Sequence, residues 1–362
     1  MQTEKMLDHV GELFRLPGKL TDYSEIKRGN INSTYKAAYT DESGETKQYI
    51  IQRINSNVFS DPASLMINID RVTSYIKARY PDQVTLQYRL APSGVNYCVD
   101  SDCFWRVCDY FESVAYDYTD DPEIIFGVGK AFGKFQSMLS GFDGSVLAET
   151  IPDFHNTAKR MQTLFDAEKT DCAKRAESVK AELDYLRSVS DKASKLSMLY
   201  AEGKIPCRVT HNDTKANNVL FERDTKRPLT VIDLDTVMPG MSLYDFGDAV
   251  RFIASTAAED EPDVSKIGFD AEKFRAFCAG YLGSVKHDLA PIEKENLVLG
   301  AFSVTIEMAA RFLTDYLQGD VYFKTHYEGH NLVRARSQIR LAQDIAAKRE
   351  QLEAIVRETL EA

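Results

Sequence analysis

The pattern of apolar and polar residues divides the chain into a strand-rich first part and a helical remainder. Up to about residue 115, β-type runs are expected at residues 28–55 (a hairpin around the polar turn 41–44), 84–90 and 96–112 (broken by a turn). A helix is expected from residue 60 to about residue 79, because Asp61 suits an N-cap and Pro62 suits a first turn. This order predicts an antiparallel sheet with one helix packed on it.

From about residue 120 the spacing of apolar residues becomes helical. Helices are expected at residues 122–140, over most of 156–201 and at 330–361, and a strand-like island at 208–235 lies between them. We place the boundary near residue 115, which gives lobes of residues 1–115 and 116–362. The prediction is an α+β protein with a small antiparallel β-sheet lobe and a large, mainly helical lobe.

Composition and charge exclude several function classes. The 362 residues include 44 Lys and Arg against 55 Asp and Glu, so the net charge is −11, which argues against a protein that follows a nucleic-acid backbone. No apolar run approaches the ~18 residues of a membrane-spanning helix, and the N-terminus is charged where a signal peptide is apolar. The six cysteines form no CxxC pair, which fits reduced thiols. We expect a cytoplasmic enzyme, a monomer or weak dimer, with no nucleic-acid or membrane partner.

The island contains four polar residues at the spacing of a phosphoryl-transfer loop. His211 and Asp213 are followed by Asn218, and Asp233 ends the next apolar run. Phosphoryl transfer needs a carboxylate that takes the proton of the acceptor hydroxyl, and oxygen ligands that hold Mg²⁺ on the nucleotide phosphates. Such residues also serve as turn caps at strand ends, but four of them beside β-type runs favour the catalytic interpretation.

The segments HNDTKANNVLF, VIDLD and LYDFGD resemble the aminoglycoside phosphotransferase/choline kinase superfamily, the small-molecule relatives of protein kinases. More narrowly, VIDLDTVMPGMSLYDFGDAVRF and RFLTDYLQGDVYFKTHYEGHNLVRAR resemble the N-acetylhexosamine 1-kinases, and with GNINSTY and YIIQRIN these blocks span nearly the whole chain. The resemblance implies a bilobal protein-kinase-like fold with ATP and Mg²⁺ between the lobes. It also implies transfer of the γ-phosphate to the anomeric hydroxyl of N-acetylglucosamine or N-acetylgalactosamine.

The resemblance assigns chemical roles to five residues of the island. Asp213 would be the catalytic base. Lys215 would offset charge on the transferring phosphoryl group, or else be a solvated lysine. Asn218 and Asp233 would be the Mg²⁺ ligands, and Asp235 would either ligate a second metal or brace the loop.

Three further residues would support this loop without reacting. His211 would be hydrogen-bonded and packed inside the protein. Asp245 and Asp248 would buttress the catalytic loop from the segment that follows it.

The turn over the nucleotide phosphates would be residues 28–34. It has one glycine where protein kinases have three. Backbone amides and four side chains are therefore the expected phosphate contacts: Asn30, Asn32, Ser33 and Thr34.

On the next strand, Gln52 and Arg53 stand where a kinase lysine is expected. Strand alternation lets only one of them face the phosphates, and arginine is the better phosphate partner by charge and geometry. The adenine is expected at the lobe junction, near Asp109 and Tyr110.

For the sugar, the resemblance matches Arg311 and Tyr322 to positions that contact the hexosamine, and Asn30 would face it as well. Hexosamine kinases often carry His where this chain has Asn30, a difference that would alter the preference among sugars. The alternatives are a surface salt bridge between Arg311 and Asp315, and simple core packing for Tyr322.

Two other motifs are assigned to structure. Gly127, Gly129 and Gly133 resemble a nucleotide-binding loop but lie in a helical pattern, so they are expected to permit close helix packing. His326 and His330 have no evident third ligand, so a zinc site is not expected there.

Two other functions stay open. The first is a kinase of another small alcohol, such as choline, homoserine, methylthioribose or an aminoglycoside. The second is a nucleotide-binding pseudokinase, which the unusual Gln52–Arg53 pair and the single-glycine turn suggest. The presence of Asp213, Asn218 and Asp233 counts against it.

Overall fold

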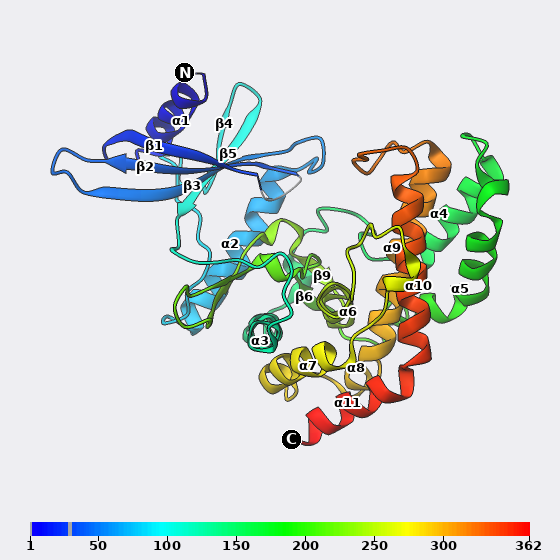
Figure 1. Ribbon diagram of the computed structural model, residues 1–362. Coiled ribbons are helices and arrows are strands. Elements are labelled where there is room, and N and C mark those ends of the chain that lie inside the picture. The colour runs from blue at the N-terminus through cyan, green and yellow to red at the C-terminus, as the bar shows by residue number, and fades with distance from the viewer. Residues whose placement is uncertain (1, 28–30) are drawn as a thin grey trace.

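The computed structural model describes residues 2–27 and 31–362, which form two lobes (Figure 1). A five-stranded antiparallel sheet forms most of the small lobe, and helices dominate the large lobe. The predicted α+β architecture is therefore confirmed. The boundary at residue 115 stays a prediction.

The strands of the small lobe are β1 (Lys19–Ile26), β2 (Ser33–Thr40), β3 (Thr46–Ile54), β4 (Cys98–Asp100) and β5 (Cys103–Asp109). Their order in the sheet is β1-β2-β3-β5-β4. β2 and β3 form the predicted hairpin. Helix α1 (Gln2–Leu13) buries Leu7 and Val10 in a small core with Tyr49 and Trp105 of the sheet.

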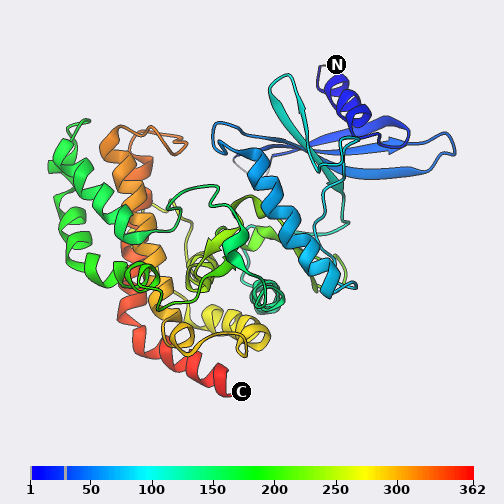
Figure 2. The same cartoon turned by 180° about the vertical axis from the view of Figure 1, so that it is seen from behind.

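Helix α2 (Pro62–Arg79) connects the sheet to the large lobe (Figure 2). It begins as predicted, because the side chain of Asp61 accepts a hydrogen bond from the amide of Ser64 at 3.1 Å. Its apolar residues, such as Leu65 and Ile69, belong to the core of the large lobe and not to the small core under α1. The position of α2 is therefore set by packing against the large lobe.

The helices of the large lobe are α3 (Pro122–Met138), α4 (Thr157–Thr170), α5 (Lys180–Ala201), α6 (Ser242–Ile253), α7 (Ala271–Val285), α8 (Pro291–Glu295), α9 (Leu297–Gln318), α10 (His330–Ala347) and α11 (Arg349–Glu361). Two small sheets pair β6 (Arg208–Thr210) with β9 (Met238–Gly240), and β7 (Val219–Phe221) with β8 (Pro228–Val231). Helix α9 is central, since α4, α5, α6 and α10 all pack against it.

Helix α9 is also more apolar than the sequence analysis allowed. An 18-residue stretch of this 22-residue helix has a mean hydropathy of 1.5, so the helix is long and apolar enough to cross a membrane by length and composition alone. However, 89% of this apolar stretch is buried inside the protein, and its neighbours are the other helices of the lobe. These features are typical of a core helix.

Two elements differ from the prediction. Residues 84–90 form no strand, because the start of β5 pairs with β4 and only one bridge, between Tyr88 and Cys108, joins this segment to the sheet. The expected helix 330–361 is divided at Lys348, since α10 packs on α9 whereas α11 packs on α7. The chain must turn to follow both surfaces.

The glycines of α3 allow it to pack closely on α7, as predicted. A Cβ atom added at Gly129 would lie 2.3 Å from the carbonyl oxygen of Phe277, and one at Gly133 would lie 2.4 Å from that of Tyr281. Both contacts are with backbone, which cannot move aside as a flexible side chain can. These glycines therefore serve helix packing.

We expect Gly129→Ala to lower the free energy of unfolding by about 1–3 kcal/mol, because α7 must shift to admit the methyl group. Gly283→Ala, on α7 with no atom within 4 Å of an added Cβ, is the matched control and should raise stability by up to ~1 kcal/mol through helix propensity. Urea unfolding measures both changes. Equal stability of the two variants would contradict the packing argument.

Candidate active site

Two carboxylates of α6 hold the backbone of the predicted catalytic loop, residues 211–218, which follows β6. The carboxylate of Asp245 accepts hydrogen bonds from the backbone amides of His211 and Asn212, each at 2.8 Å. The carboxylate of Asp248 accepts one from the amide of Thr214 at 3.0 Å. Asn212 has a left-handed backbone with φ of 65°, a conformation that asparagine tolerates better than most residues. The predicted buttressing is confirmed.

His211 is a structural residue of the loop, as predicted. Its Nδ1 accepts the amide of Asp213 at 3.2 Å, so its proton lies on Nε2, which donates to the carbonyl oxygen of Ile232 at 2.9 Å. The rings of Phe132 and Phe135 pack against the imidazole with centroids 5.5 and 6.0 Å away. The imidazole therefore joins the loop to the end of β8.

Asp213 presents a partly exposed carboxylate with a cation beside it. The Nζ of Lys215 lies 2.8 Å from Oδ1, and Nδ2 of Asn218 donates to Oδ2 at 3.1 Å. Burial lowers the pKa of Lys215, but the charge and hydrogen bond of Asp213, together with the charges of Asp248 and Glu259, raise it overall. Such a carboxylate can accept a proton from a hydroxyl group while the ammonium offsets negative charge nearby.

Asp233 lies after β8 in a left-handed conformation, with φ of 59° and ψ of 56°. Its solvent-accessible carboxylate makes no hydrogen bond or ion pair with the described residues. The surrounding protein disfavours the charged form, and the negative charges of Asp235 and Asp213 add to this effect, so the pKa of Asp233 rises to about 7. A cation at this position would relieve the repulsion.

The residues near Asp233 fit a divalent cation. Nδ2 of Asn218 donates hydrogen bonds to the carbonyl oxygen and the carboxylate of Asp213, which leaves its Oδ1 available as a ligand. No three His, Cys, Asp or Glu side chains in the described part of the chain form a complete metal site. The remaining ligands of Mg²⁺ would be nucleotide phosphates and water. The ligand roles of Asn218 and Asp233 stay predictions.

Asp235 has different surroundings. Its Oδ1 accepts a hydrogen bond from Nη1 of Arg106 at 2.6 Å, and its Oδ2 accepts one from Nδ2 of Asn32 at 2.6 Å. The side chains of Arg106 and Asp235 are 0% and 5% exposed. These bonds join Asp235 to β5 and to the turn before β2, not to residues 211–218, so bracing of the catalytic loop stays a prediction. Ligation of a second metal stays a prediction, although both oxygens are already bonded within the protein.

Arg106 is the important residue that sequence reasoning missed. It lies opposite Gln52 in the pairing of β5 with β3, and its Nε donates to Gln52 Oε1 at 2.9 Å. Gln52 in turn donates to Thr34 at 3.0 Å, whereas Arg53 is exposed on the other face. The available signal was an arginine inside the apolar run 103–108, because a buried charge needs a partner.

The other predicted nucleotide contacts are less informative. Asn30 lies outside the described residues. Ser33 begins β2, and Asp109 accepts a hydrogen bond from Arg89 at 2.7 Å on the surface. The ring of Tyr110 has a lysine ammonium 3.9 Å from its centroid. Their nucleotide-binding roles stay predictions.

Arg311 and Tyr322 lie in one cluster. The guanidinium of Arg311 lies 5.4 Å from the ring centroid of Phe154 and 5.6 Å from that of Phe323, against which Tyr322 packs edge-on at 4.8 Å. The carboxylate of Asp315 accepts hydrogen bonds from the backbone amides of residues 321–323 and forms no salt bridge with Arg311. The side chain of Tyr322 is not in the core, because this residue is 68% exposed. The salt-bridge and core-packing alternatives are therefore wrong.

A second arginine completes this cluster, which we call the aromatic–arginine wall: Phe154, Arg160, Arg311, Tyr322 and Phe323. Arg160 on α4 donates to the carbonyl oxygen of Phe154 at 3.2 Å, and its buried Nε has no partner. Burial and the positive charge of Arg311 lower the pKa of Arg160. Neither arginine forms an ion pair with a carboxylate among the described residues.

Contacts through His155 place the aromatic–arginine wall beside the catalytic loop. His155 follows Phe154 and lies 3.3 Å from the carbonyl oxygen of Asn212 and 2.8 Å from the carboxylate of Glu307. Glu307 precedes Arg311 by one turn of α9. These contacts connect the wall to the loop that carries the predicted base, and their union in one site stays a prediction. Sequence reasoning missed Arg160 because nothing in its local sequence marks it.

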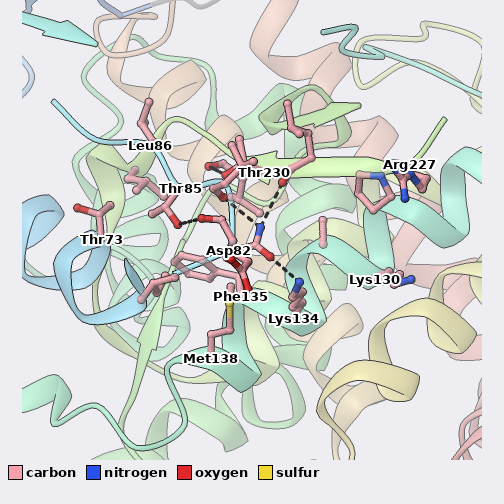
Figure 3. A pocket seen from close by; sticks show the side chains of 18 of the residues that line it. Thr73, Asp82, Thr85, Leu86, Lys130, Lys134, Phe135, Met138, Arg227 and Thr230 are labelled. Atoms are coloured by element: carbon pink, nitrogen blue, oxygen red, sulfur yellow. Dashed lines mark hydrogen bonds between the residues drawn. The ribbon is translucent and has the colours of Figure 1, made fainter. Parts of the chain in front are cut away.

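A separate cavity of about 380 Å³ lies between α2, α3 and β8 (Figure 3). Thr73, Lys134, Phe135 and Thr230 are among the residues around it, and none of the predicted catalytic or ligand-binding residues lines it. Gln83 crosses it, since its amide donates to the carbonyl oxygens of Val84 and Leu229 and accepts from Lys134. This cavity is distinct from the candidate site.

Comparison with known proteins assigns the family. The model of a phosphotransferase enzyme family matches residues 22–283. The chain belongs to this phosphotransferase family. The fold is accordingly the kinase-like one expected from the sequence, with the sheet as the N-lobe and the helices as the C-lobe.

Solved structures agree on the fold of this phosphotransferase. A microcompartment-associated aminopropanol kinase matches with a TM-score of 0.67 and 16% identity, over 96% of this chain and 98% of that one. An amicoumacin kinase in complex with AMP-PNP and Ca²⁺ has a TM-score of 0.61 and 12% identity, over 94% and 93%. The choline kinase of Cryptosporidium parvum Iowa II has a TM-score of 0.53 and 13% identity, over 94% and 93%.

For this phosphotransferase we expect Arg106→Met to lower the free energy of unfolding by about 3–5 kcal/mol, because the buried Asp235 loses its counter-charge. The double variant with Asp235→Asn should regain part of that loss. Arg53→Met, on the exposed face of β3, is the control and should change stability by less than about 0.5 kcal/mol. Urea unfolding tests this, and similar losses for Arg106→Met and Arg53→Met would refute it.

Proposed function

We propose that this phosphotransferase is an ATP-dependent N-acetylhexosamine 1-kinase. It transfers the γ-phosphate of ATP to the anomeric hydroxyl of N-acetylglucosamine or N-acetylgalactosamine. The observation that carries the proposal is the aromatic–arginine wall beside the catalytic loop, because its chemistry suits a neutral acceptor rich in oxygen atoms. The same observation disfavours the cationic acceptors among the alternatives.

The wall offers two guanidinium groups and exposed aromatic surface. Arg160 and Arg311 donate hydrogen bonds and accept none, so they suit the hydroxyl and acetamide oxygens of an N-acetylated sugar. The ring of Tyr322 offers a flat apolar face for the sugar carbons. The ammonium group of choline or an aminoglycoside would be repelled by two guanidinium groups that have no carboxylate partner.

The proposed chemistry uses the arrangement around Asp213. Its carboxylate accepts the proton of the anomeric hydroxyl as that oxygen bonds to the γ-phosphorus and the bond to the β–γ bridging oxygen breaks, releasing ADP. Lys215 offsets negative charge on the phosphoryl oxygens. Asn218 and Asp233 would hold Mg²⁺, which neutralises charge on the phosphates when bound.

The nucleotide is proposed to lie under the turn that includes Asn30, with its phosphates near Ser33 and Thr34. The register of β3 sets Gln52 opposite Arg106, which supports Gln52 and not Arg53 as the residue that faces the phosphates. The adenine would lie near residues 109–110. We also propose that the enzyme acts in the cytoplasm as a monomer or weak dimer.

The role of Asp213 as the base can be tested by assay and mutation. With Mg·ATP, we expect ADP release with N-acetylglucosamine or N-acetylgalactosamine and a sugar 1-phosphate signal in phosphorus NMR. Asp213→Asn should reduce kcat by about 10²–10⁴-fold while calorimetry shows unchanged binding of ATP. Glucose, galactose, choline, homoserine and kanamycin complete the acceptor panel.

The panel separates the possible outcomes. Turnover only with choline, homoserine or kanamycin would retain Asp213 as the base but refute the sugar proposal. Full activity of Asp213→Asn would refute its role as base. ATP binding without turnover of any acceptor would favour the pseudokinase alternative.

The binding of the acceptor sugar by the aromatic–arginine wall can be tested separately. Arg311→Met should raise KM for the sugar about tenfold or more, because a hydrogen bond from a charged donor is worth about 1.5–3 kcal/mol, while KM for ATP stays within about twofold. Arg160→Met should act in the same direction. Arg349→Met, on the exposed surface of α11, is the matched control for loss of a guanidinium. Steady-state kinetics tests this, and an equal rise in the two KM values would contradict an acceptor-specific role.

A further inference from the structure

One buried imidazole touches the catalytic loop from outside the reacting groups. His155 lies just before α4, and its side chain is only 7% exposed. Its Nδ1 is 2.8 Å from Oε1 of Glu307, and its Nε2 is 3.3 Å from the carbonyl oxygen of Asn212. Because Asn212 directly precedes Asp213, this ring joins α9 to the proposed base through one peptide group.

Both partners of the ring are hydrogen-bond acceptors. The carboxyl group of Glu307 also accepts a hydrogen bond from the hydroxyl of Thr157 at 2.7 Å. Despite burial, this bond and the positive charges of His155 and Arg311 lower its pKa, which favours the ionised, acceptor-only form. A carbonyl oxygen can only accept. A neutral imidazole has one N–H and can satisfy one of these acceptors, whereas the imidazolium has two and satisfies both. The geometry therefore favours the charged ring.

The charges around His155 act in both directions. Burial lowers its pKa, and Arg311 on α9 does the same. The carboxylates of Glu307 on α9 and Asp248 on α6 raise it, and the net result is a raised pKa. From α6, Tyr244 also packs against the imidazole, with ring centroids 5.5 Å apart. Burial raises the pKa of Glu307, but the combined effects of His155, Arg311 and Thr157 lower it overall.

We propose that protonated His155 is a positioning residue for phosphoryl transfer: its two N–H groups fix the peptide of Asn212 against Glu307 and thereby hold Asp213 in place. Asn212 has the left-handed φ of 65°, so the peptide that carries this bond lies at the sharpest turn of the loop. When the ring loses its proton, one of the two bonds is lost and the loop is released on that side.

The sign of the effect follows from the two bonds. A histidine with a raised pKa is fully protonated at pH values below the ordinary value of about 6.5. Its contribution is lost as the pH rises through its pKa in the folded protein. Turnover therefore falls on the alkaline side. This inference rests on the proposed role of Asp213, not on the identity of the acceptor alcohol.

The direct test follows His155 by NMR, without activity. The chain has 6 histidines, and the imidazole of His155 is assigned by its absence in His155→Gln. In the wild type we expect its midpoint above 6.5 and the same midpoint in the backbone amide shift of Asp213. In His155→Gln, the plot of the Asp213 amide shift against pH should lose this titration step. In Glu307→Gln, the midpoint of the step should move to lower pH.

Kinetics gives the second readout, with any acceptor that is turned over. His155→Gln should lower kcat below neutral pH by about tenfold, the loss expected for a bond from a charged donor, and should abolish the corresponding alkaline limb. KM for ATP should stay unchanged. His9→Gln, on the half-exposed surface of α1, is the control and should retain the wild-type profile.

The outcomes are distinct. A midpoint of His155 at or below 6.5, or an Asp213 amide that does not follow it, would overturn the inference even if the sugar is phosphorylated. A loss of kcat in His155→Gln with the alkaline limb retained would also overturn it, because it would indicate a purely structural role. If no sugar is turned over but the linked NMR midpoints are present, the proposed substrate fails and the positioning role stands.

Discussion

The ion pair between Arg106 and Asp235 determines how the two lobes meet. Both side chains are almost fully removed from water, and an unpaired charge at either position would cost several kcal/mol. The pair joins β5 of the N-lobe to the segment after β8, only two residues beyond Asp233. The N-lobe sheet and the expected metal ligand are therefore linked by one interaction.

The catalytic loop has little regular structure of its own, so its amides need acceptors from elsewhere. Asp245 and Asp248 supply them from α6, and His211 joins the loop to the end of β8. His155 approaches from the side of α9. Asp213 is thus held by elements that are distant in sequence, although it lies in a contiguous motif.

This difference explains what the sequence could predict. The hairpin and the cap of α2 depend on neighbouring residues, and they were found. The buttressing of the loop by Asp245 and Asp248 is not local, and it was found because both segments resemble a known family. Residues 84–90 were expected to be a strand because their composition is β-like, yet the competing pairing of β4 with β5 decides the outcome. Arg106 was missed because its partner lies 129 residues away, and the choice between Gln52 and Arg53 depends on strand register.

The aromatic–arginine wall is even less visible in the sequence, because it combines α4, α9 and the segment after α9. Burial and the positive charge of Arg311 lower the pKa of Arg160, so the cluster weakens the fold that carries it. Proteins tolerate such local conflicts mainly where a site needs them. The carboxylates of Glu307 and Asp153 offset the repulsion between the two guanidinium groups only in part. Neither Arg160 nor Arg311 forms an ion pair with a carboxylate among the described residues, which is the strongest structural reason to regard the wall as a binding surface.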